Sequence, residues 1–169
     1  METNRLFFAL WPDDRQREQL REVINSVAKT VEGHAVDRRN WHVTLAWVGD
    51  YPADRAPQLL ERASEIQFEP FRLSFDRLEF WARPKIASLT AATVPEELHN
   101  LVTALENLLQ DEGLAHDSRT YRPHITVSRH ARTFETERLA HRTSIEWSRF
   151  DLVESLPGHG GAHYRPLKQ

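Results

Sequence analysis

The chain has 169 residues, a length that suits one compact domain or two small lobes that share a core. It contains no cysteine, which excludes disulfides, a thiolate nucleophile and a zinc site of the cysteine type. The net charge of −3 argues against a broad electrostatic nucleic-acid binder. The longest unbroken apolar run, 6–11, is too short to cross a bilayer, and no basic-then-apolar leader is seen, so we expect a soluble cytoplasmic protein.

Apolar runs and turn residues in the first half of the chain predict two pairs of a strand and a helix. The run at 5–11 is typical of a buried strand, and the proline and acids after it favour a helix over 14–29. A second strand is expected at 42–48. A second helix is expected at 52–64, although Pro57 falls inside it.

The second half begins with a long strand. Apolar residues alternate along 71–81 but change phase part-way, which predicts a bulge, and 85–93 is expected to form a hairpin with this strand. The apolar stripe of 95–111 predicts the clearest helix, with Gly113 as its natural end. Further strands are expected at 119–129, 145–156 and 164–167, and a hairpin turn at 158–161.

This order of elements predicts an α+β protein, with mostly antiparallel sheets and helices on the outside. No linker or low-complexity segment interrupts the chain, so we expect a single domain over 1–169.

Two similar tetrapeptides, HVTL at 42–45 and HITV at 124–127, place a histidine and a threonine two residues apart in apolar runs. Alternate side chains of a strand share a face, so the histidine and threonine of each copy point the same way. In the first copy, we expect Trp47 on the opposite face with the apolar residues. Each copy lies in a half with its own helix, which predicts two lobes that bring both pairs together across a cleft.

Two histidines and two threonines suit the cleavage of a phosphodiester without a metal. One neutral imidazole accepts a proton from the attacking oxygen, and one imidazolium donates a proton to the leaving oxygen. Threonine hydroxyls can hydrogen-bond the non-bridging phosphate oxygens. A 2′,3′-cyclic phosphate is a fitting substrate because its strained ring lowers the barrier.

Other interpretations of these residues are weaker. A single His-x-Thr is usually structural, and a zinc site lacks a carboxylate at ligand spacing beside either histidine. Neither G-x-S-x-G nor a P-loop occurs in the chain. The glycines at 158–161 could form an anion nest, but a hairpin turn is the preferred interpretation. The other histidines are expected to be surface or supporting residues: His34, His99, His116, His130, His141, His159 and His163.

The stretch 119–132 carries four arginines, two histidines and no acid. Chance is one explanation, because arginine is common in this chain. A small pocket for one phosphate is the other, since guanidinium matches phosphate in a bidentate way. The HITV motif in the middle of the stretch favours the pocket.

On these residues the chain resembles the 2H phosphoesterase superfamily, specifically the RNA 2′,3′-cyclic phosphodiesterase or 2′-5′ RNA ligase family. Family members carry two H-x-[ST]-h motifs (h apolar), here HVTL and HITV. The resemblance extends in the right order over essentially the whole chain, through RLFFALWPDD, NWHVTLAWVG, YRPHITVSR and LVESLPGHGGAHYRPL. Trp47 stands where the family usually has phenylalanine.

The resemblance implies a bilobal fold of two pseudo-symmetric antiparallel sheets with outer helices and a central cleft. It implies hydrolysis of 2′,3′-cyclic phosphates, at RNA ends or on nucleosides, to 2′-phosphates, and some members also join RNA through a 2′-5′ linkage. No metal or other cofactor is implied. The resemblance further implies that Arg129 and Arg122 flank the phosphate. Candidates to stack on a base are Phe8, Trp11 and Trp81.

For a 2′-phosphate product O3′ must leave. His42 is assigned as the acid that protonates O3′, and His124 as the base on water. Arg122 and Arg129 are expected to favour neutral His124, so that His42 keeps its proton better. The pseudo-symmetry leaves the reverse assignment nearly as plausible. Alternative functions are a 2H enzyme acting on ADP-ribose cyclic phosphate or 2′-5′ oligoadenylate, and a non-catalytic module that binds RNA ends. We expect a monomer.

Overall fold

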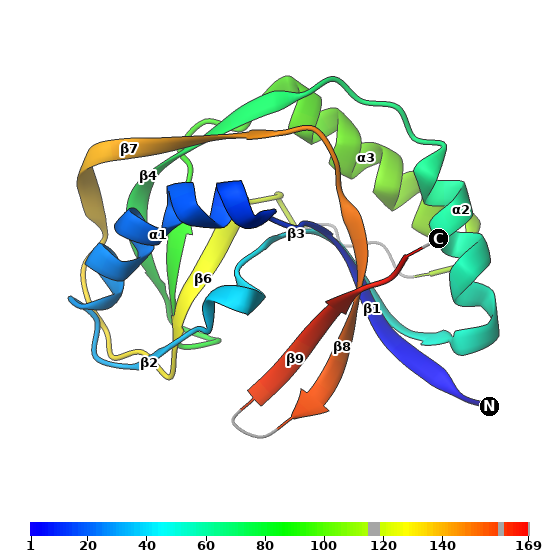
Figure 1. Cartoon of the computed structure of the whole chain (residues 1–169), viewed down its shortest axis with the longest axis horizontal. Coiled ribbons are helices and arrows are strands. Elements are labelled where there is room, and N and C mark those ends of the chain that lie inside the picture. Colours follow the sequence, from blue (N-terminus) through cyan, green and yellow to red (C-terminus); the bar gives the residue numbers. More distant parts are fainter. Residues whose placement is uncertain (115–118, 159–160, 169) are drawn as a thin grey trace.

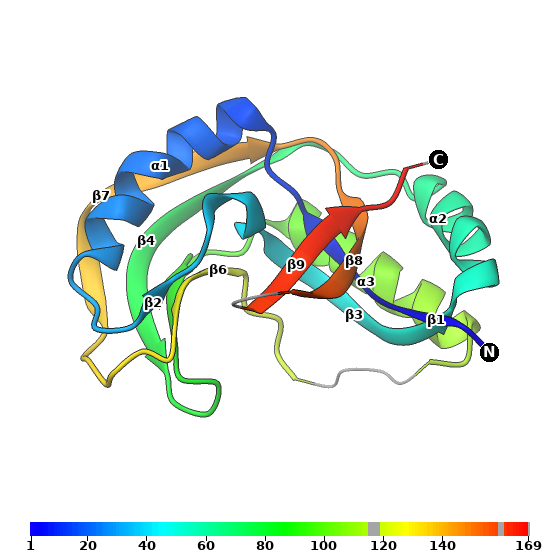
Figure 2. The same cartoon turned by 60° about the horizontal axis from the view of Figure 1, so that its bottom comes forward.

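The computed structural model describes residues 1–114, 119–158 and 161–168. Two sheets make up the fold, and every strand pair in them is antiparallel. Figures 1 and 2 show the sheets splayed apart, with helices on their outer sides. The expected α+β class with two antiparallel sheets is confirmed.

The four-stranded sheet has the order β3-β1-β8-β9 and combines both ends of the chain. Its strands are β1 (Thr3–Leu10), β3 (Val43–Pro52), β8 (Asp151–Gly158) and β9 (Gly161–Pro166). The five-stranded sheet has the order β2-β6-β5-β4-β7. Its strands are β2 (His34–Ala35), β4 (Phe71–Trp81), β5 (Ile86–Thr90), β6 (His124–Arg129) and β7 (Glu137–Trp147).

In the described part of the chain, three α-helices and two short 3₁₀ helices connect the strands. They are α1 (Asp14–Ala28), η1 (Arg38–Asn40), η2 (Ala53–Arg55), α2 (Ala56–Ser64) and α3 (Glu96–Asp111). Asp13 and Gln16 form a capping box that begins α1. Pro57 lies in the first turn of α2, where a missing amide hydrogen costs nothing, so the helix starts later than expected. None of the described helices is long and apolar enough to span a membrane.

The helices are exchanged between the sheets. Helix α1 follows β1 of the four-stranded sheet but packs against β6 and β7 of the other sheet, whereas α3 follows β5 and packs against β3 (Figures 1 and 2). One hydrophobic core therefore includes residues of both sheets and of all three α-helices. A second, smaller cluster lies on the other face of the four-stranded sheet, and it consists of Phe7, Ala9, Trp11 and Val153 with Tyr164 packed against them.

The strand expected at 145–156 is wrong, because the chain there forms two strands. β7 ends at Trp147 in the five-stranded sheet, and β8 begins at Asp151 in the four-stranded sheet. Apolar residues continue through the crossing because Trp147, Phe150 and Leu152 all pack against the same core. The alternation of apolar residues therefore did not mark the change of sheet.

The strand expected at 119–129 is too long, since β6 begins at His124. The preceding Pro123 has no amide hydrogen for the ladder. The expected bulge in β4 is confirmed by a register shift against β7 between Phe75 and Arg77. The sequence did not predict the first part of β7, because this edge strand is mostly exposed and its apolar and polar residues do not alternate there.

Candidate active site

His42 lies directly before β3, at the edge of the four-stranded sheet. Three aromatic rings surround its partly buried imidazole at centroid distances of 5.1, 5.8 and 5.2 Å, and these are Phe7, Trp11 and Tyr164. The Nδ1–H group donates to the carbonyl oxygen of Asn40 at 2.7 Å. Because a carbonyl only accepts, the neutral ring carries its proton on Nδ1. Nε2 then accepts from the Thr44 hydroxyl at 3.1 Å.

His124 repeats this arrangement in the five-stranded sheet. It is the first residue of β6, and its Nδ1–H group donates to the carbonyl oxygen of Arg122 at 3.0 Å. In each motif the carbonyl two residues before the histidine therefore selects the same tautomer. The ring of Trp81, from β4, lies against His124 at a centroid distance of 4.1 Å. Both imidazoles are thus held by a main-chain hydrogen bond and by aromatic packing.

Both His-x-Thr pairs face one cavity of about 120 Å³ between the sheets. The residues that line it are Phe7, His42, Thr44, Trp47, His124, Thr126, Arg129 and Tyr164. Arg129, at the end of β6, is exposed and supplies the guanidinium of this lining, and its Nη2 lies 3.4 Å from the Tyr164 hydroxyl. The cavity therefore offers two imidazoles, two threonine hydroxyls and one guanidinium to a small anion.

Burial lowers the pKa of both histidines. The pKa of His42 falls to about 4, first because of burial and then because of the positive charges of His124 and Arg129, while the hydrogen bond to Asn40 opposes the shift. The pKa of His124 is also lowered, by burial and by the positive charge of Arg122, whereas the hydrogen bond to the Arg122 carbonyl and the charge of Glu79 oppose the shift. The expectation that His42 keeps its proton better is therefore not met in the free protein, mainly because the His42 ring is buried and also because the charges of His124 and Arg129 act on it.

Arg122 lies outside the residues that line the cavity. Its guanidinium forms an ion pair with Glu79 at 2.6 Å and lies 4.9 Å from the Trp81 ring centroid. Glu79 also accepts a hydrogen bond from Thr90 at 2.6 Å. The structure therefore does not support the expected contact of Arg122 with the phosphate, because a carboxylate already occupies this guanidinium.

The aromatic candidates differ in where they lie. Phe8 is wrong as a base-stacking residue, because its side chain is fully buried in the main core on the face of β1 opposite Phe7. Trp11 is buried and stacks on His42 at an interplanar angle of 22°, and Trp81 packs on His124. Trp11 and Trp81 therefore pack against the two imidazoles, and neither lines the cavity.

Sequence reasoning missed three residues of the cavity, which are Phe7, Trp47 and Tyr164. Trp47 lies on the cavity side because the pairing of β1 with β3 shifts register between Phe8 and Ala9, so that Ala9 pairs with Thr44 but Phe7 with Trp47. The neighbouring Leu45 and Ala46 are both buried, and this break in alternation is a signal of the bulge.

Two further expectations concern the histidines and the glycine turn. Residues 159–160 and His116 lie outside the described part of the chain, so the anion nest at 158–161 is not placed, although Gly158 pairs with Gly161 as in a hairpin. His34 and His130 contact each other edge to face at 5.3 Å, beside a neighbouring groove of about 500 Å³. In the described ranges no three His, Cys, Asp or Glu residues group as a metal site would require.

Known proteins resemble this chain in sequence, one of them over 99% of its length. The family model described as LigT like phosphoesterase matches residues 10–88. The RNA 2′,3′-cyclic phosphodiesterase of Escherichia coli is 29% identical over 172 residues, covering 99% of this chain and 96% of the relative. The protein of the same name from Archaeoglobus fulgidus is 29% identical over 127 residues, covering 74% of this chain and 72% of the relative.

Solved structures extend this agreement to the fold. The crystal structure of E. coli LigT complexed with 3′-AMP is 30% identical to this chain and superimposes with a TM-score of 0.86. The match covers 99% of this chain and 97% of that chain. The apo form of E. coli LigT has the same identity and TM-score. With two sheets that present two His-x-Thr pairs to one cavity, this chain belongs to the family of LigT-like phosphoesterases.

Proposed function

We propose that the protein is an RNA 2′,3′-cyclic phosphodiesterase that uses two histidines to open the cyclic phosphate to a 2′-phosphate. The observation that carries the proposal is the single small cavity lined by both His-x-Thr pairs and Arg129. The Escherichia coli relative, which matches 99% of this chain, is named RNA 2′,3′-cyclic phosphodiesterase. We further propose that the protein is a cytoplasmic monomer and that its reaction needs no metal.

The charge of the substrate is matched by groups in the cavity. The phosphate of a 2′,3′-cyclic nucleotide is a monoanion, and the guanidinium of Arg129 provides the opposite charge. The hydroxyls of Thr44 and Thr126 donate to the non-bridging oxygens, where negative charge concentrates as the fifth bond to phosphorus forms. These contacts favour the transition state over free substrate.

Two proton transfers complete the reaction. His124 removes a proton from water as the water oxygen bonds to phosphorus, and His42 donates a proton to O3′ as the bond from phosphorus to O3′ breaks. The products are a 3′-hydroxyl and a 2′-phosphate, with one water consumed. In both rings the main-chain carbonyl holds Nδ1–H, which leaves Nε2 as the atom that exchanges protons. With a 5′-hydroxyl in place of water, the same transfers produce a 2′-5′ linkage.

His42 needs a proton to act as the acid, although the free protein holds it neutral at pH 7. An anionic phosphate beside the ring favours the imidazolium, and the effect is large in a buried site. We therefore propose that His42 takes up this proton when the substrate binds. His124 is neutral in the free protein at pH 7 as a base should be, because its pKa is also lowered.

The test is turnover of adenosine 2′,3′-cyclic phosphate in excess EDTA, with the product identified by phosphorus NMR. We expect adenosine 2′-phosphate. Replacing His42 or His124 by alanine should lower kcat by about 10²–10⁴-fold, as for general acid–base groups elsewhere. The double variant should lose less than the product of the two single losses, because the two groups act as one unit.

His99→Ala is the matched control, since His99 is exposed on α3 and outside the cavity lining. It should retain activity, and circular dichroism should show that all variants are folded. A 3′-phosphate product, dependence on added metal, or an equal loss in the His99 variant would contradict the proposal.

A further inference from the structure

Glu79 is a carboxylate of β4 that lies close to His124 but outside the cavity lining. Its side chain is 18% exposed. One carboxylate oxygen accepts a hydrogen bond from the Arg122 guanidinium and the other from the buried Thr90 hydroxyl, each at 2.6 Å. Burial raises the pKa of Glu79, but the hydrogen bonds from Thr90 and Arg122 outweigh it, so the pKa lies below its ordinary value. Glu79 is therefore an anion held by two short hydrogen bonds.

Both partners of Glu79 are connected to His124. Thr90 pairs with His124 in the register of β5 and β6. The main-chain carbonyl oxygen of Arg122 accepts from the Nδ1–H group of His124 at 3.0 Å. The Arg122 guanidinium lies 4.9 Å from the ring centroid of Trp81, which itself packs on His124 at 4.1 Å. The carboxylate therefore holds the side chain of the residue whose carbonyl orients the imidazole.

The first His-x-Thr motif has an equivalent arrangement without an ion pair. Asn40 stands two residues before His42, and its main-chain carbonyl accepts from the His42 ring. The side-chain amide of Asn40 donates to the carbonyl oxygen of Ala162 on β9 at 3.1 Å. In both motifs the residue that supplies the carbonyl is thus fixed to another strand through its own side chain. The repetition in two different sheets indicates that this anchoring serves the imidazole.

The ion pair gives Glu79 a second effect, on the charge around His124. In the described part of the chain, the charged and titratable groups around this ring are Arg122 and Glu79 beside it, and His42, Arg129 and Tyr164 across the shared cavity. Burial is the first cause that lowers the pKa of His124, the positive charge of Arg122 adds to it, and the negative charge of Glu79 opposes both. Without Glu79, the guanidinium charge beside the ring would have no carboxylate to offset it.

We propose that Glu79 is a positioning residue for His124, because it holds Arg122 so that the Arg122 carbonyl fixes the imidazole proton on Nδ1 and the guanidinium charge stays neutralised. The inference rests on the proposed function, since it takes His124 as the base. A ring with its proton on Nδ1 presents the free Nε2 lone pair to water. The other tautomer presents an N–H group there and cannot accept a proton.

Glu79→Gln tests the charge alone. Glutamine keeps an oxygen for Arg122 and a polar group for the Thr90 hydroxyl, but it has no negative charge. Nitrogen NMR of the histidines, with His124→Ala to assign the signal, should show that the neutral His124 ring keeps its proton on Nδ1. The pH at which His124 titrates should fall, because the charge that opposed Arg122 is gone. The limb of the kcat/KM profile that belongs to His124 should move to lower pH with it.

Glu79→Ala removes the holding as well. We expect part of His124 to carry its proton on Nε2 and kcat to fall by about 10- to 100-fold, since a misplacement of about 1 Å can cost ~10²-fold. Arg122→Ala should lower kcat similarly but move the His124 titration to higher pH, because it removes a positive charge. The double variant should lose no more kcat than either single variant, because both substitutions break the same interaction.

Glu154 provides the matched control. This carboxylate of β8 is 7% exposed, pairs with Arg165 at 2.6 Å and lies in the other sheet, outside the cavity lining. Glu154→Gln and Glu154→Ala should leave kcat, the His124 tautomer and the His124 titration unchanged.

Two results would overturn the inference. In the first, Glu79→Ala leaves both the tautomer and the titration of His124 as they are in the wild-type protein, so that Glu79 contributes to stability alone. In the second, Glu154→Ala changes them equally. Failure of the proposed function is a separate result, in which the wild-type protein does not open the cyclic phosphate. The NMR measurements need no substrate, so they still decide whether Glu79 positions His124 in that case.

Discussion

Burial and neighbouring charge set the protonation of the two imidazoles that face the cavity. In the free protein the pKa of both lies below 6.5, and that of His42 is about 4. A histidine with a lowered pKa is neutral over most of the physiological range. The acid form of His42 is therefore lost as the pH rises past about 4, whereas the base form of His124 is lost as the pH falls below its own pKa.

These directions predict an acid-shifted pH profile. Because kcat/KM reports the free enzyme, and only molecules with protonated His42 and neutral His124 react, we expect the two limbs of its profile near pH 4 and at the pKa of His124, which lies below 6.5. Both limbs are therefore expected on the acid side of neutrality. The measurement is kcat/KM for adenosine 2′,3′-cyclic phosphate at closely spaced pH values.

The same assignment predicts that His42 gains a proton when adenosine 2′-phosphate binds. Histidine NMR at pH 6, with and without the nucleotide, measures this directly, and His42→Ala identifies the signal. If His124 gains the proton and His42 stays neutral, the acid and base roles must be exchanged.

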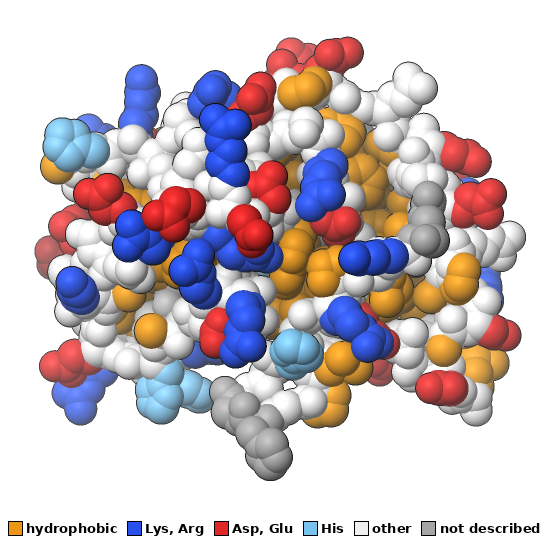
Figure 3. All heavy atoms as spheres, in the orientation of Figure 1, with side chains coloured by type: hydrophobic (Ala, Val, Ile, Leu, Met, Phe, Trp, Pro, Cys, Tyr) orange, Lys and Arg blue, Asp and Glu red, His pale blue; other side chains and the backbone are white. Residues whose placement is uncertain are grey.

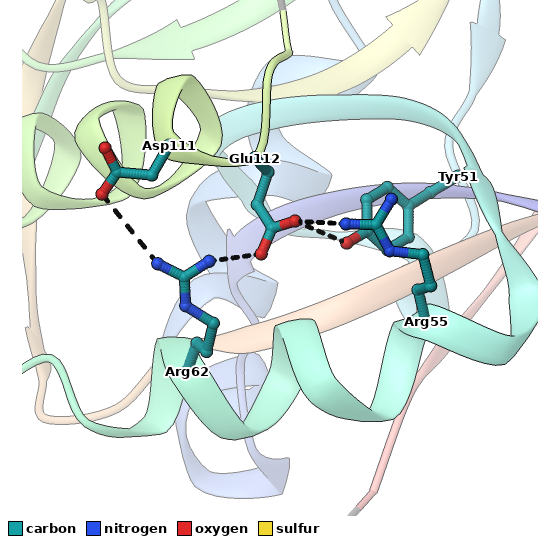
Figure 4. Close-up of polar contacts among 5 residues, drawn as sticks. All are labelled: Tyr51, Arg55, Arg62, Asp111 and Glu112. Carbon is teal, nitrogen blue, oxygen red and sulfur yellow. Dashed lines mark hydrogen bonds and ion pairs between the residues drawn. The ribbon is translucent and has the colours of Figure 1, made fainter.

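Among the secondary-structure elements, one carboxylate joins β3, η2 and α2 to the end of α3. Glu112, directly after α3, is only 7% exposed and binds the Tyr51 hydroxyl and the guanidinium groups of Arg55 and Arg62 (Figure 4). The Arg55 contact is 2.8 Å and the Tyr51 contact 3.2 Å. The carboxylate therefore connects the end of α3 with α2 and β3, and neither it nor its partners line the cavity of the histidines.

Glu112→Gln should destabilise the fold without changing kcat. The amide keeps the shape but cannot accept from all three partners, and hydrogen bonds to a charged group are worth about 1.5–3 kcal/mol. Both arginines are about half exposed and can be hydrated, so we expect a loss of roughly 1–2 kcal/mol in the free energy of unfolding by urea.

The adjacent Asp111→Asn is the matched control. Asp111 is 71% exposed, and its contact with Arg62 is 3.9 Å, so its replacement should change stability by less than about 0.5 kcal/mol. Equal effects of the two substitutions would show that net charge, and not the buried carboxylate, stabilises this corner.

On the scale of the whole molecule, the exchange of α1 and α3 between the sheets joins the two lobes. Two hydrogen bonds also connect the sheets. The hydroxyl of Tyr121, just before β6, donates to the carbonyl oxygen of Thr44 at 2.9 Å. The side-chain amide of Asn40 donates to the carbonyl oxygen of Ala162 at 3.1 Å. On the face shown in Figure 3, basic and acidic side chains intermingle without a continuous basic surface. Recognition of a small anion in one cavity fits this surface better than binding along an extended nucleic acid.

A shared core predicts that the lobes unfold together. Neither sheet can keep its buried face covered once the helix supplied by the other half is lost. We expect one transition in urea, with the same midpoint by circular dichroism and by tryptophan fluorescence. Glu112→Gln should move both midpoints equally. Two separated transitions, or a shift seen by one probe alone, would mean that the lobes are independent domains.

The sequence was sufficient where short-range geometry decides the outcome. In α1, α3 and the bulge of β4, local periodicity and end residues determine the element, and in HVTL and HITV strict alternation places each histidine beside its threonine. These features depend on a few neighbouring residues, so they can be inferred without knowledge of the packing.

Only the tertiary structure decided which groups surround those histidines. β1 is buried on both faces, so its apolar run carries no sign that Phe7 faces the cavity and Phe8 the core. The place of Trp47 depends on the register between β1 and β3, and the ion pair of Arg122 depends on Glu79, 43 residues away along the chain. Alternation of apolar and polar residues shows that the two faces of a strand differ, but it does not identify the groups that pack against each face. Sheet pairing and side-chain packing between distant segments determine those groups.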